Sequence, residues 1–183
     1  MTDPVLAPPL FIIRRLNADE AAASIEALAD VLIDCVEGGA SVGFMWPLPR
    51  AKAVAFWRGV ADSVGRNERV LLVAEDAGGA IVGTAQLITD MPENQPHRGE
   101  VAKMLVYRKV RRQGLAQGLL AAVEDAARAT GKTVLVLDTA TGGDAERLYQ
   151  RAGWTRAGTV PDYALMPDGM LCGTTFFYKR PLT

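Results

Sequence analysis

The chain has 183 residues, of which 49% are hydrophobic and 22% are charged, and its formal net charge is −1. A chain of this length can bury a substantial core in one domain, and the composition is that of a soluble globular protein. A net charge so close to zero argues against nucleic acid as the main partner. We therefore expect one domain over residues 1–183, with the proline-containing residues 1–9 as a loose leader.

Cysteine usage and hydropathy predict where the protein works. Cys35 and Cys172 are too few for a disulfide framework, which favours a reducing compartment. The N-terminus lacks the basic and apolar regions of a signal peptide, and no stretch reaches the roughly 18 to 20 apolar residues that a membrane span needs. We expect a cytoplasmic protein that does not bind membranes.

The N-terminal part predicts a strand and two helices. Phe11–Arg15 is strand-like. Asn17 and Glu20 form a capping-box pattern at the start of a helix that ends at Gly38-Gly39, and a second helix covers about residues 50–65. The loop between the helices, 38–49, contains glycine and proline and leaves Phe44, Met45 and Trp46 without a regular element. These three side chains cover the core as a lid or line a substrate pocket, and both interpretations stay open.

A hairpin and a parallel unit are predicted next. Strands at 69–75 and 80–89 flank Asp-Ala-Gly-Gly, a hairpin signal, and a loop at 90–99 leads into a core strand at 100–106. An amphipathic helix then runs to about Thr130. The apolar run at 133–137 suits a central strand covered on both faces. A strand, a helix and a strand of these lengths predict a right-handed unit with parallel strands.

A short helix at 143–151 and strands at about 155–160 and 171–179 complete the chain. The predicted fold is α/β: a mixed, mainly antiparallel, twisted sheet of about six to seven strands, flanked by about four helices. No internal repeat or linker divides it.

The turn before the helix that starts at about residue 115 has the character of an anion site. Five of the twenty basic residues lie within ten positions: Lys103, Arg108, Lys109, Arg111 and Arg112. Unpaired amides and the helix dipole at a helix start both favour negative charge. The nucleotide P-loop pattern is absent, and Gly114 and Gly118 do not make a dinucleotide fingerprint. A small polyanion, most simply a pyrophosphate, is expected here.

One phosphate-binding pattern does fit this turn. Arg/Gln-x-x-Gly-x-Gly/Ala is present as Arg111-Arg112-Gln113-Gly114-Leu115-Ala116. Here the chain resembles the GCN5-related N-acetyltransferases (GNAT), which bind the coenzyme A pyrophosphate on this turn, and over most of its length it is most similar to their tabtoxin-resistance type. Six segments carry the resemblance: GGASVGFM (38–45), EVAKMLV (100–106), RRQGLA (111–116), LDT (137–139), AERLY (145–149) and TRAGTVPDYALMPDG (155–169).

The resemblance implies how acetyl-CoA, the expected co-substrate, is held. The two parallel strands splay apart, and the pantetheine arm pairs with the exposed backbone of Met104, Leu105 and Val106 as an extra strand would. One N–H group there faces the thioester oxygen. No metal is expected, because the only histidine, His97, lies in a proline-rich loop.

The resemblance also implies the catalytic residues. A primary amine is charged at neutral pH, so a carboxylate must take its proton, and Glu100 and Asp138 match the acids given this role. Glu100 lies roughly 16 Å along an ideal strand from the thioester position, so it needs a strand bulge or a water chain. Tyr149 would protonate the leaving thiolate. The alternatives are strand-end carboxylates in salt bridges and a buried core tyrosine.

Two positions qualify the resemblance. Many family members have Asn seven residues before the tyrosine, where this chain has Gly142, so one coenzyme contact is in doubt. Tyr163 is a pocket residue by resemblance only. We expect an acetyl-CoA-dependent N-acetyltransferase that acts on a small amine, such as an amino-acid-like toxin or antibiotic. A non-catalytic acyl-CoA-binding sensor and a protein or peptide N-acetyltransferase are the alternatives, and a homodimer stays open.

Overall fold

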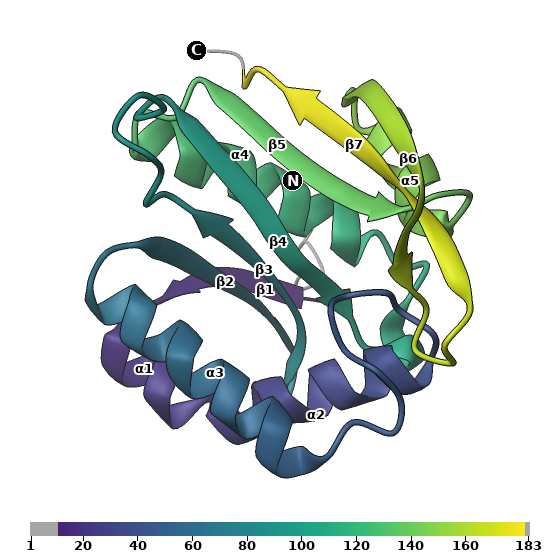
Figure 1. Cartoon of the computed structure of the whole chain (residues 1–183). Coiled ribbons are helices and arrows are strands. Elements are labelled where there is room, and N and C mark those ends of the chain that lie inside the picture. Colours follow the sequence, from purple (N-terminus) through teal and green to yellow (C-terminus); the bar gives the residue numbers. More distant parts are fainter. Residues whose placement is uncertain (1–10, 182–183) are drawn as a thin grey trace, which may run out of the picture.

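The computed structural model of the protein describes residues 11–181 and contains one seven-stranded sheet of order β1-β2-β3-β4-β5-β7-β6 (Figure 1). Only β4 and β5 run parallel; every other neighbouring pair is antiparallel. The predicted fold class is confirmed. The elements are β1 (Phe11–Leu16), α1 (Ala18–Ala23), α2 (Ile25–Glu37), α3 (Arg50–Gly65), β2 (Arg69–Asp76), β3 (Ile81–Ile88), β4 (Arg98–Val106), the 3₁₀ turn η1 (Arg108–Val110), α4 (Leu115–Ala129), β5 (Val134–Ala140), α5 (Asp144–Arg151), β6 (Thr155–Leu165) and β7 (Leu171–Lys179).

Local signals set most element boundaries. The capping box is formed: the Asn17 side chain accepts from the Glu20 N–H at 2.9 Å, and Glu20 accepts from the Asn17 N–H at 2.8 Å. The first predicted helix is broken at Ser24, which gives five α-helices in the described chain rather than about four. Gly131, with a φ of +69°, follows the end of α4 as expected.

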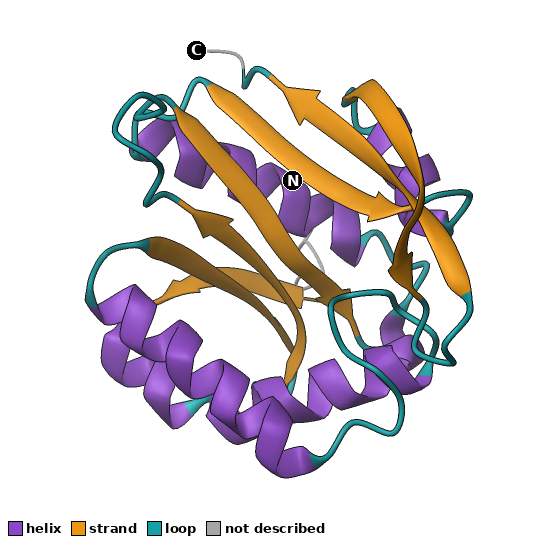
Figure 2. Ribbon diagram, in the orientation of Figure 1, coloured by secondary structure: helices purple, strands orange, loops and turns teal. Residues whose placement is uncertain are grey.

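Helices cover the two faces of the sheet unequally (Figure 2). On one face α1, α2 and α3 pack against β1–β4, and Trp57 is fully buried between them. On the other face α4 and α5 cover a second core that includes Leu119, Leu135 and Phe177. The first face of β5, β7 and β6 therefore has no helix over it, and we call it the open face.

Strands β4 and β5 pair over only three residues and then separate. The pairs are Arg98 with Val134, Gly99 with Leu135 and Glu100 with Val136. Beyond them β4 bulges, because its register with β3 shifts between Ala102 and Leu105 and Lys103 takes a φ of +50°. A bulge bends a strand and increases its twist. The separation that the sequence predicts between these strands is therefore present.

Three strand ends differ from prediction by two residues or more, and all belong to strands with distant partners. Strand β4 begins at Arg98. Strand β5 continues to Ala140, so Asp138 lies inside the strand opposite Phe176 of β7, not at its carboxyl end. Strand β6 reaches Leu165. The expectation that β5 is covered on both faces is also wrong: its buried residues alternate with partly exposed ones, because one side is the open face.

Glycine substitutions test how tightly the paired part of β4 and β5 is packed. A Cβ at Gly99 would lie 2.7 Å from Leu87 Cδ1 and 3.2 Å from Leu135 Cδ2. Gly99→Val should therefore lower the free energy of unfolding by about 1–3 kcal/mol, the usual cost of overpacking. Gly59→Ala, with no atom within 4 Å of the added Cβ, should raise it by about 0.5–1 kcal/mol. Urea unfolding measures both, and a neutral Gly99→Val would contradict the packing.

Candidate active site

The turn that leads into α4 presents unpaired backbone amides. Gly114, the residue before the helix, has a φ of +81°, and no side chain caps the helix start. No acceptor within residues 11–181 contacts the N–H groups of residues 113–116. The helix dipole adds partial positive charge at the same place. This geometry suits an anion, and glycine permits the close approach of one.

Two of the basic residues near this turn are engaged within the protein. Arg108 binds Asp34 through its backbone N–H and its Nε, both at 2.9 Å, and its guanidinium also binds Glu37. Lys109 Nζ lies 5.0 Å from the centre of the Tyr107 ring. Arg108 therefore contributes less charge to the turn than the sequence indicates, because acids of α2 neutralise part of it.

Arg111 and Arg112 have different environments. The Nε of Arg111 donates to the Val106 carbonyl at 3.1 Å, and its guanidinium lies 3.8 Å from the Cys35 sulfur. The Cys35 thiol donates to the same carbonyl at 3.5 Å, and burial raises the pKa of this thiol, which keeps it a donor. Arg112 is exposed and makes no hydrogen bond or ion pair with another side chain in the described chain, so its charge is available to an anion.

At the free edge of β4, the backbone groups of two residues are directed toward the gap between β4 and β5. The Tyr107 N–H donates to the Val82 carbonyl of β3 at 2.9 Å. Backbone groups of an antiparallel strand alternate between its two neighbours, so Leu105 also faces β3 and Met104 and Val106 face β5. Three residues of this strand were predicted to contact the coenzyme: Met104, Leu105 and Val106. The Leu105 side chain lies in the core and its backbone pairs with β3, so only Met104 and Val106 present backbone groups to the gap.

The open face brings two acids and a lysine together. Glu100 pairs with Val136, and Asp138 lies two residues further along β5, so both carboxylates project from one face. The pKa of Asp138 is raised, first by burial and then by the Glu100 charge, while Lys103 opposes this shift. Glu100 also forms an ion pair with Arg98 at 3.5 Å. The strand bulge that Glu100 requires for a catalytic role is present at Lys103.

Tyr149 lies in the core on the opposite side of the sheet. It is only 5% exposed, and its ring packs at 5.9 Å from Trp154 and 6.0 Å from Phe177, measured between centroids. Burial raises the pKa of its hydroxyl, and the Asp138 charge raises it further. The tyrosine is therefore protonated at neutral pH, and the charge of Asp138 on the open face contributes to its raised pKa. The core position predicted as the alternative and the acid role are compatible.

The loop at 38–49 serves partly as a lid. Phe44 packs edge-on against Phe56 of α3, with ring centroids 5.3 Å apart. Met45 and Trp46 are 41% and 45% exposed, and the Trp46 N–H donates to the Pro167 carbonyl at 3.0 Å. The loop is thus tied to the turn after β6. Phe44 belongs to the covered core, while Met45 and Trp46 remain available to a ligand.

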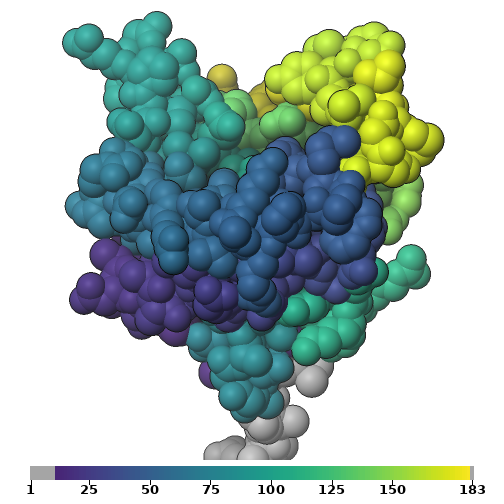
Figure 3. Space-filling view, turned by 60° about the horizontal axis from the view of Figure 1, so that its bottom comes forward, coloured from purple at the N-terminus to yellow at the C-terminus, as the bar shows by residue number. Residues whose placement is uncertain are grey.

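The rim opposite α3 is aromatic. Tyr163 is 55% exposed and meets Phe176 edge-on at 5.6 Å, and Phe176 pairs with Asp138. The space-filling view shows a hollow between the teal segment before β4 and the yellow strand β7 (Figure 3). Sequence reasoning missed Phe56 as part of this face. Its only signal was helical spacing, which marks a core residue equally well.

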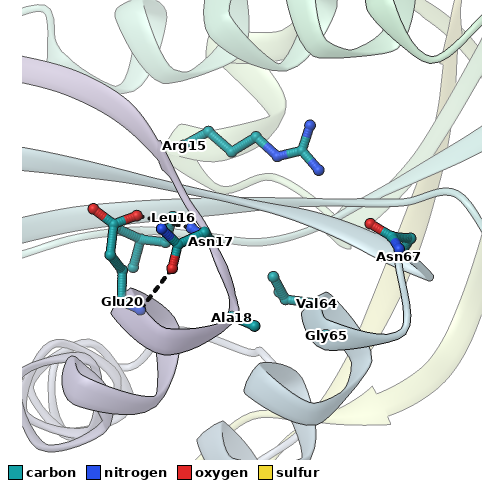
Figure 4. A pocket seen from close by; sticks show the side chains of 8 residues that line it. All are labelled: Arg15, Leu16, Asn17, Ala18, Glu20, Val64, Gly65 and Asn67. Carbon is teal, nitrogen blue, oxygen red and sulfur yellow. Dashed lines mark hydrogen bonds between the residues drawn. The ribbon is translucent and has the colours of Figure 1, made fainter.

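Two further hollows lie away from these acids. One, of about 320 Å³, lies beside Trp46 and is lined by the end of α2 and by Met166, Pro167 and Asp168. The other, of about 400 Å³, lies between the start of α1 and the end of α3 (Figure 4). Asn17 and Glu20 line the second hollow, and in the capping box the side chain of each accepts a hydrogen bond from the backbone N–H of the other. The second hollow is therefore explained by helix capping.

None of the helices between residues 11 and 181 combines the length and the hydropathy of a membrane-spanning segment. In the same range no group of three or more His, Cys, Asp or Glu side chains could hold a metal ion, and His97 is exposed.

Parallel strands that separate beside a helix start with free amides suit a ligand with an anionic head and an extended arm. Residues 26–154 match the model of the Acetyltransferase (GNAT) family, which is more than half of the chain. The chain belongs to this family.

Relatives agree with that assignment. The chain is 36% identical over 113 residues to a protein of Azospirillum brasilense named an uncharacterized N-acetyltransferase in the hisH-hisA intergenic region. The match spans 61% of this chain and 65% of that relative's length.

Solved structures share the fold. A GNAT superfamily phosphinothricin acetyltransferase from Sinorhizobium meliloti, solved in complex with acetyl-CoA, aligns with a TM-score of 0.76 at 16% identity over 94% of this chain and 89% of its own. A ribosomal-protein-alanine N-acetyltransferase from Brucella melitensis aligns with a TM-score of 0.74 at 24% identity over 92% and 99%. Proteins named for a small-molecule and for a protein acceptor thus resemble this fold about equally.

The charges on the open face predict opposite effects on Asp138. Glu100→Gln should lower the pKa of Asp138, and Lys103→Met should raise it, because Glu100 raises and Lys103 lowers it in the wild type. Lys52→Met, an exposed change on α3, should leave it unaltered. A carbon-13 NMR titration of labelled aspartate measures all three. Shifts of the reverse sign would mean that these groups do not share one face.

Proposed function

We propose that this protein transfers the acetyl group of acetyl-CoA to the primary amine of a small molecule. The observation that carries the proposal is the three-residue pairing of β4 with β5, which leaves a free strand edge beside the amides at the start of α4. Membership of an acetyltransferase family supports it. The resemblance to the tabtoxin-resistance type favours a small acceptor, such as an amino-acid-like toxin or antibiotic.

The coenzyme pyrophosphate would be held by the turn from Arg111 to Ala116. The backbone amides of Gln113, Gly114, Leu115 and Ala116 supply donors, and Arg112 supplies charge. Arg111 would also have a second role: its Nε donates to the Val106 carbonyl and so holds the edge of β4 next to the turn. The residues present therefore fit the group. Acetyl-CoA contributes a thioester, whose carbonyl carbon is open to attack by an amine.

The edge of β4 would orient the pantetheine arm and the thioester. Met104 and Val106 direct their N–H groups toward the gap, where an extended arm can pair with them as a strand does. One such donor aimed at the thioester oxygen contributes about 10² to 10³ in rate. The carbonyl of Val106 is already bound by Arg111 and Cys35, so the N–H of Val106 is its backbone group that faces a ligand.

Asp138 and Glu100 would accept the proton of the amine. An amine with a pKa of about 10.4 must lose its proton before attack, and a carboxylate with a raised pKa is a stronger base than an ordinary one. Asp138 has such a raised pKa because of burial and of Glu100. Glu100 would pass the proton on toward solvent. Tyr149, protonated and close enough to feel Asp138, would supply a proton to the leaving thiolate.

Phe44, Met45, Trp46 and Tyr163 would enclose the acceptor. Met45, Trp46 and Tyr163 are partly exposed apolar side chains on both rims of the open face, and Phe44 supports the rim from below. The contact between Trp46 and Pro167 closes the face on one side. An acceptor held between two such rims would be a small molecule in preference to a folded protein.

Coenzyme binding is tested by two equally strained glycine substitutions. Gly114 and Gly79 have φ values of +81° and +79°, and neither has an atom within 4 Å of an added Cβ. Replacement of either by Ala should cost about 1–2 kcal/mol of stability through backbone strain. Only Gly114→Ala should weaken acetyl-CoA binding, by about tenfold, because only that turn meets the pyrophosphate. Isothermal titration calorimetry measures the affinities, and absence of heat for wild type at millimolar acetyl-CoA would refute the coenzyme.

Catalysis is tested at Asp138. Asp138→Asn should lower turnover by about 10² to 10⁴, with little change in coenzyme affinity. It should not lower stability. Because the folded-state pKa is raised, the ionised carboxylate is disfavoured by the fold at neutral pH, and the amide removes that penalty. Thiol release over a panel of amines measures turnover, and Asp62→Asn on the exposed side of α3 is the control. Unchanged turnover would remove Asp138 from the mechanism.

A further inference from the structure

Lys103 is a half-buried cation that no internal acid neutralises by direct contact. It occupies the bulge of β4, with a φ of +50°. Its Nζ lies 5.5 Å from the centre of the Phe56 ring. No carboxylate of the described chain lies within 4.0 Å of it, and it makes no hydrogen bond there. A partly buried ammonium that contacts a ring but no carboxylate favours a ligand that supplies one.

A second cation lies in the same part of the face. Arg69, at the start of β2, donates to Ser63 Oγ at 2.8 Å and to Gln86 Oε1 at 2.7 Å, and burial lowers its pKa. Glu68 binds Arg66 at 2.6 Å and accepts from Ser63 Oγ at 2.9 Å, and its charge raises the pKa of Arg69 against the effect of burial. The buried Nε2 of Gln86 has no hydrogen-bond partner in the described chain. This corner therefore holds a partly buried guanidinium and one unpaired amide donor.

The acids of the open face act on Lys103 only at a distance. Glu100 is paired with Arg98 at 3.5 Å, and neither Glu100 nor Asp138 forms an ion pair with Lys103 in the described chain. Burial is the main cause of the lowered pKa of Lys103; the charge of Asp138 opposes this shift, Arg69 lowers the pKa further, and Glu100 also opposes the shift. The face thus has carboxylates that suit an ammonium and, beside them, ammonium and guanidinium groups that suit a carboxylate.

We propose that Lys103 binds a carboxylate of the acceptor, with Arg69 adding positive charge behind it, so that the acceptor is an amine that also carries a carboxylate. This inference rests on the proposed acetyl transfer and specifies its substrate class. An anion next to Lys103 also keeps the lysine protonated, because an opposite charge offsets the effect of burial.

Matched pairs of acceptors test the inference. Each L-amino acid is compared with the amine that lacks its carboxylate, at saturating acetyl-CoA, by thiol release. In wild type, the best amino acid should have a kcat/KM at least tenfold higher than that of the matching amine without the carboxylate. Lys103→Met should remove that preference by raising KM for the amino acid about 10- to 100-fold, the effect of one hydrogen bond to a charged group. The preference is a ratio within each variant, so an effect of Lys103→Met on the base Asp138 changes the amino acid and the simple amine alike and does not alter it.

Two variants separate this role from a structural one. Lys103→Arg keeps the charge and should retain most of the preference. Lys52→Met removes a lysine that lies 5.8 Å from the centre of the Phe44 ring, and it should leave the preference unchanged. Calorimetry with N-acetyl amino acids and N-acetyl amines, added to the coenzyme A complex, provides a readout without turnover: only the former should bind, and only when position 103 is cationic.

The outcomes distinguish the two proposals. No turnover on any amine refutes the proposed function, and the binding of N-acetyl amino acids then decides the inference. Turnover without a preference for the carboxylate, or a preference that survives Lys103→Met, refutes the inference and leaves acetyl transfer intact.

Discussion

Strand β4 can pair with β5 over only three residues, and the rest of the site depends on that constraint. The bulge at Lys103 turns the strand away, so the backbone groups of Met104 and Val106 lose a strand partner. Buried backbone groups need partners, and within residues 11–181 the Val106 carbonyl finds them in Cys35 and Arg111. The N–H groups of Met104 and Val106 form a free strand edge, which under the proposed function the pantetheine arm completes.

Unequal helix cover assigns the two proposed chemical roles to opposite sides of this gap. Tyr149 comes from α5 behind the sheet, where burial keeps its hydroxyl protonated. Asp138 stands on the open face, where Glu100 and partial burial raise its basicity. Under the proposed mechanism a base and an acid must act on different atoms without neutralising each other. The gap between the strands is the place that both sides can reach, which separates proton removal from proton donation by the thickness of one sheet.

Features of the fold that depend on a few neighbouring residues could be predicted from the sequence. Features that depend on partners far along the chain could not. Asn17 with Glu20 and the φ of Gly131 set helix ends within one turn of chain. The extension of β5 to Ala140 depends on pairing with β7, and the loss of Arg108 from the basic patch depends on acids 71 and 74 residues away. Sequence alone also could not reveal that Arg111 folds back onto Val106.

The same contrast explains why the coenzyme side of the site is easier to recognise than the acceptor side. The proposed coenzyme contacts are mostly backbone groups of one continuous segment, so a short motif describes them. The open face takes side chains from α3, β4, β5 and β7, and the fold alone does not fix them. Lys103 links the two: its left-handed backbone lies in the bulge where β4 leaves β5, and its ammonium lies over the Phe56 ring, where we propose that it meets the acceptor. Under that proposal one residue sets both the path of the strand beside the coenzyme arm and the charge beside the acceptor.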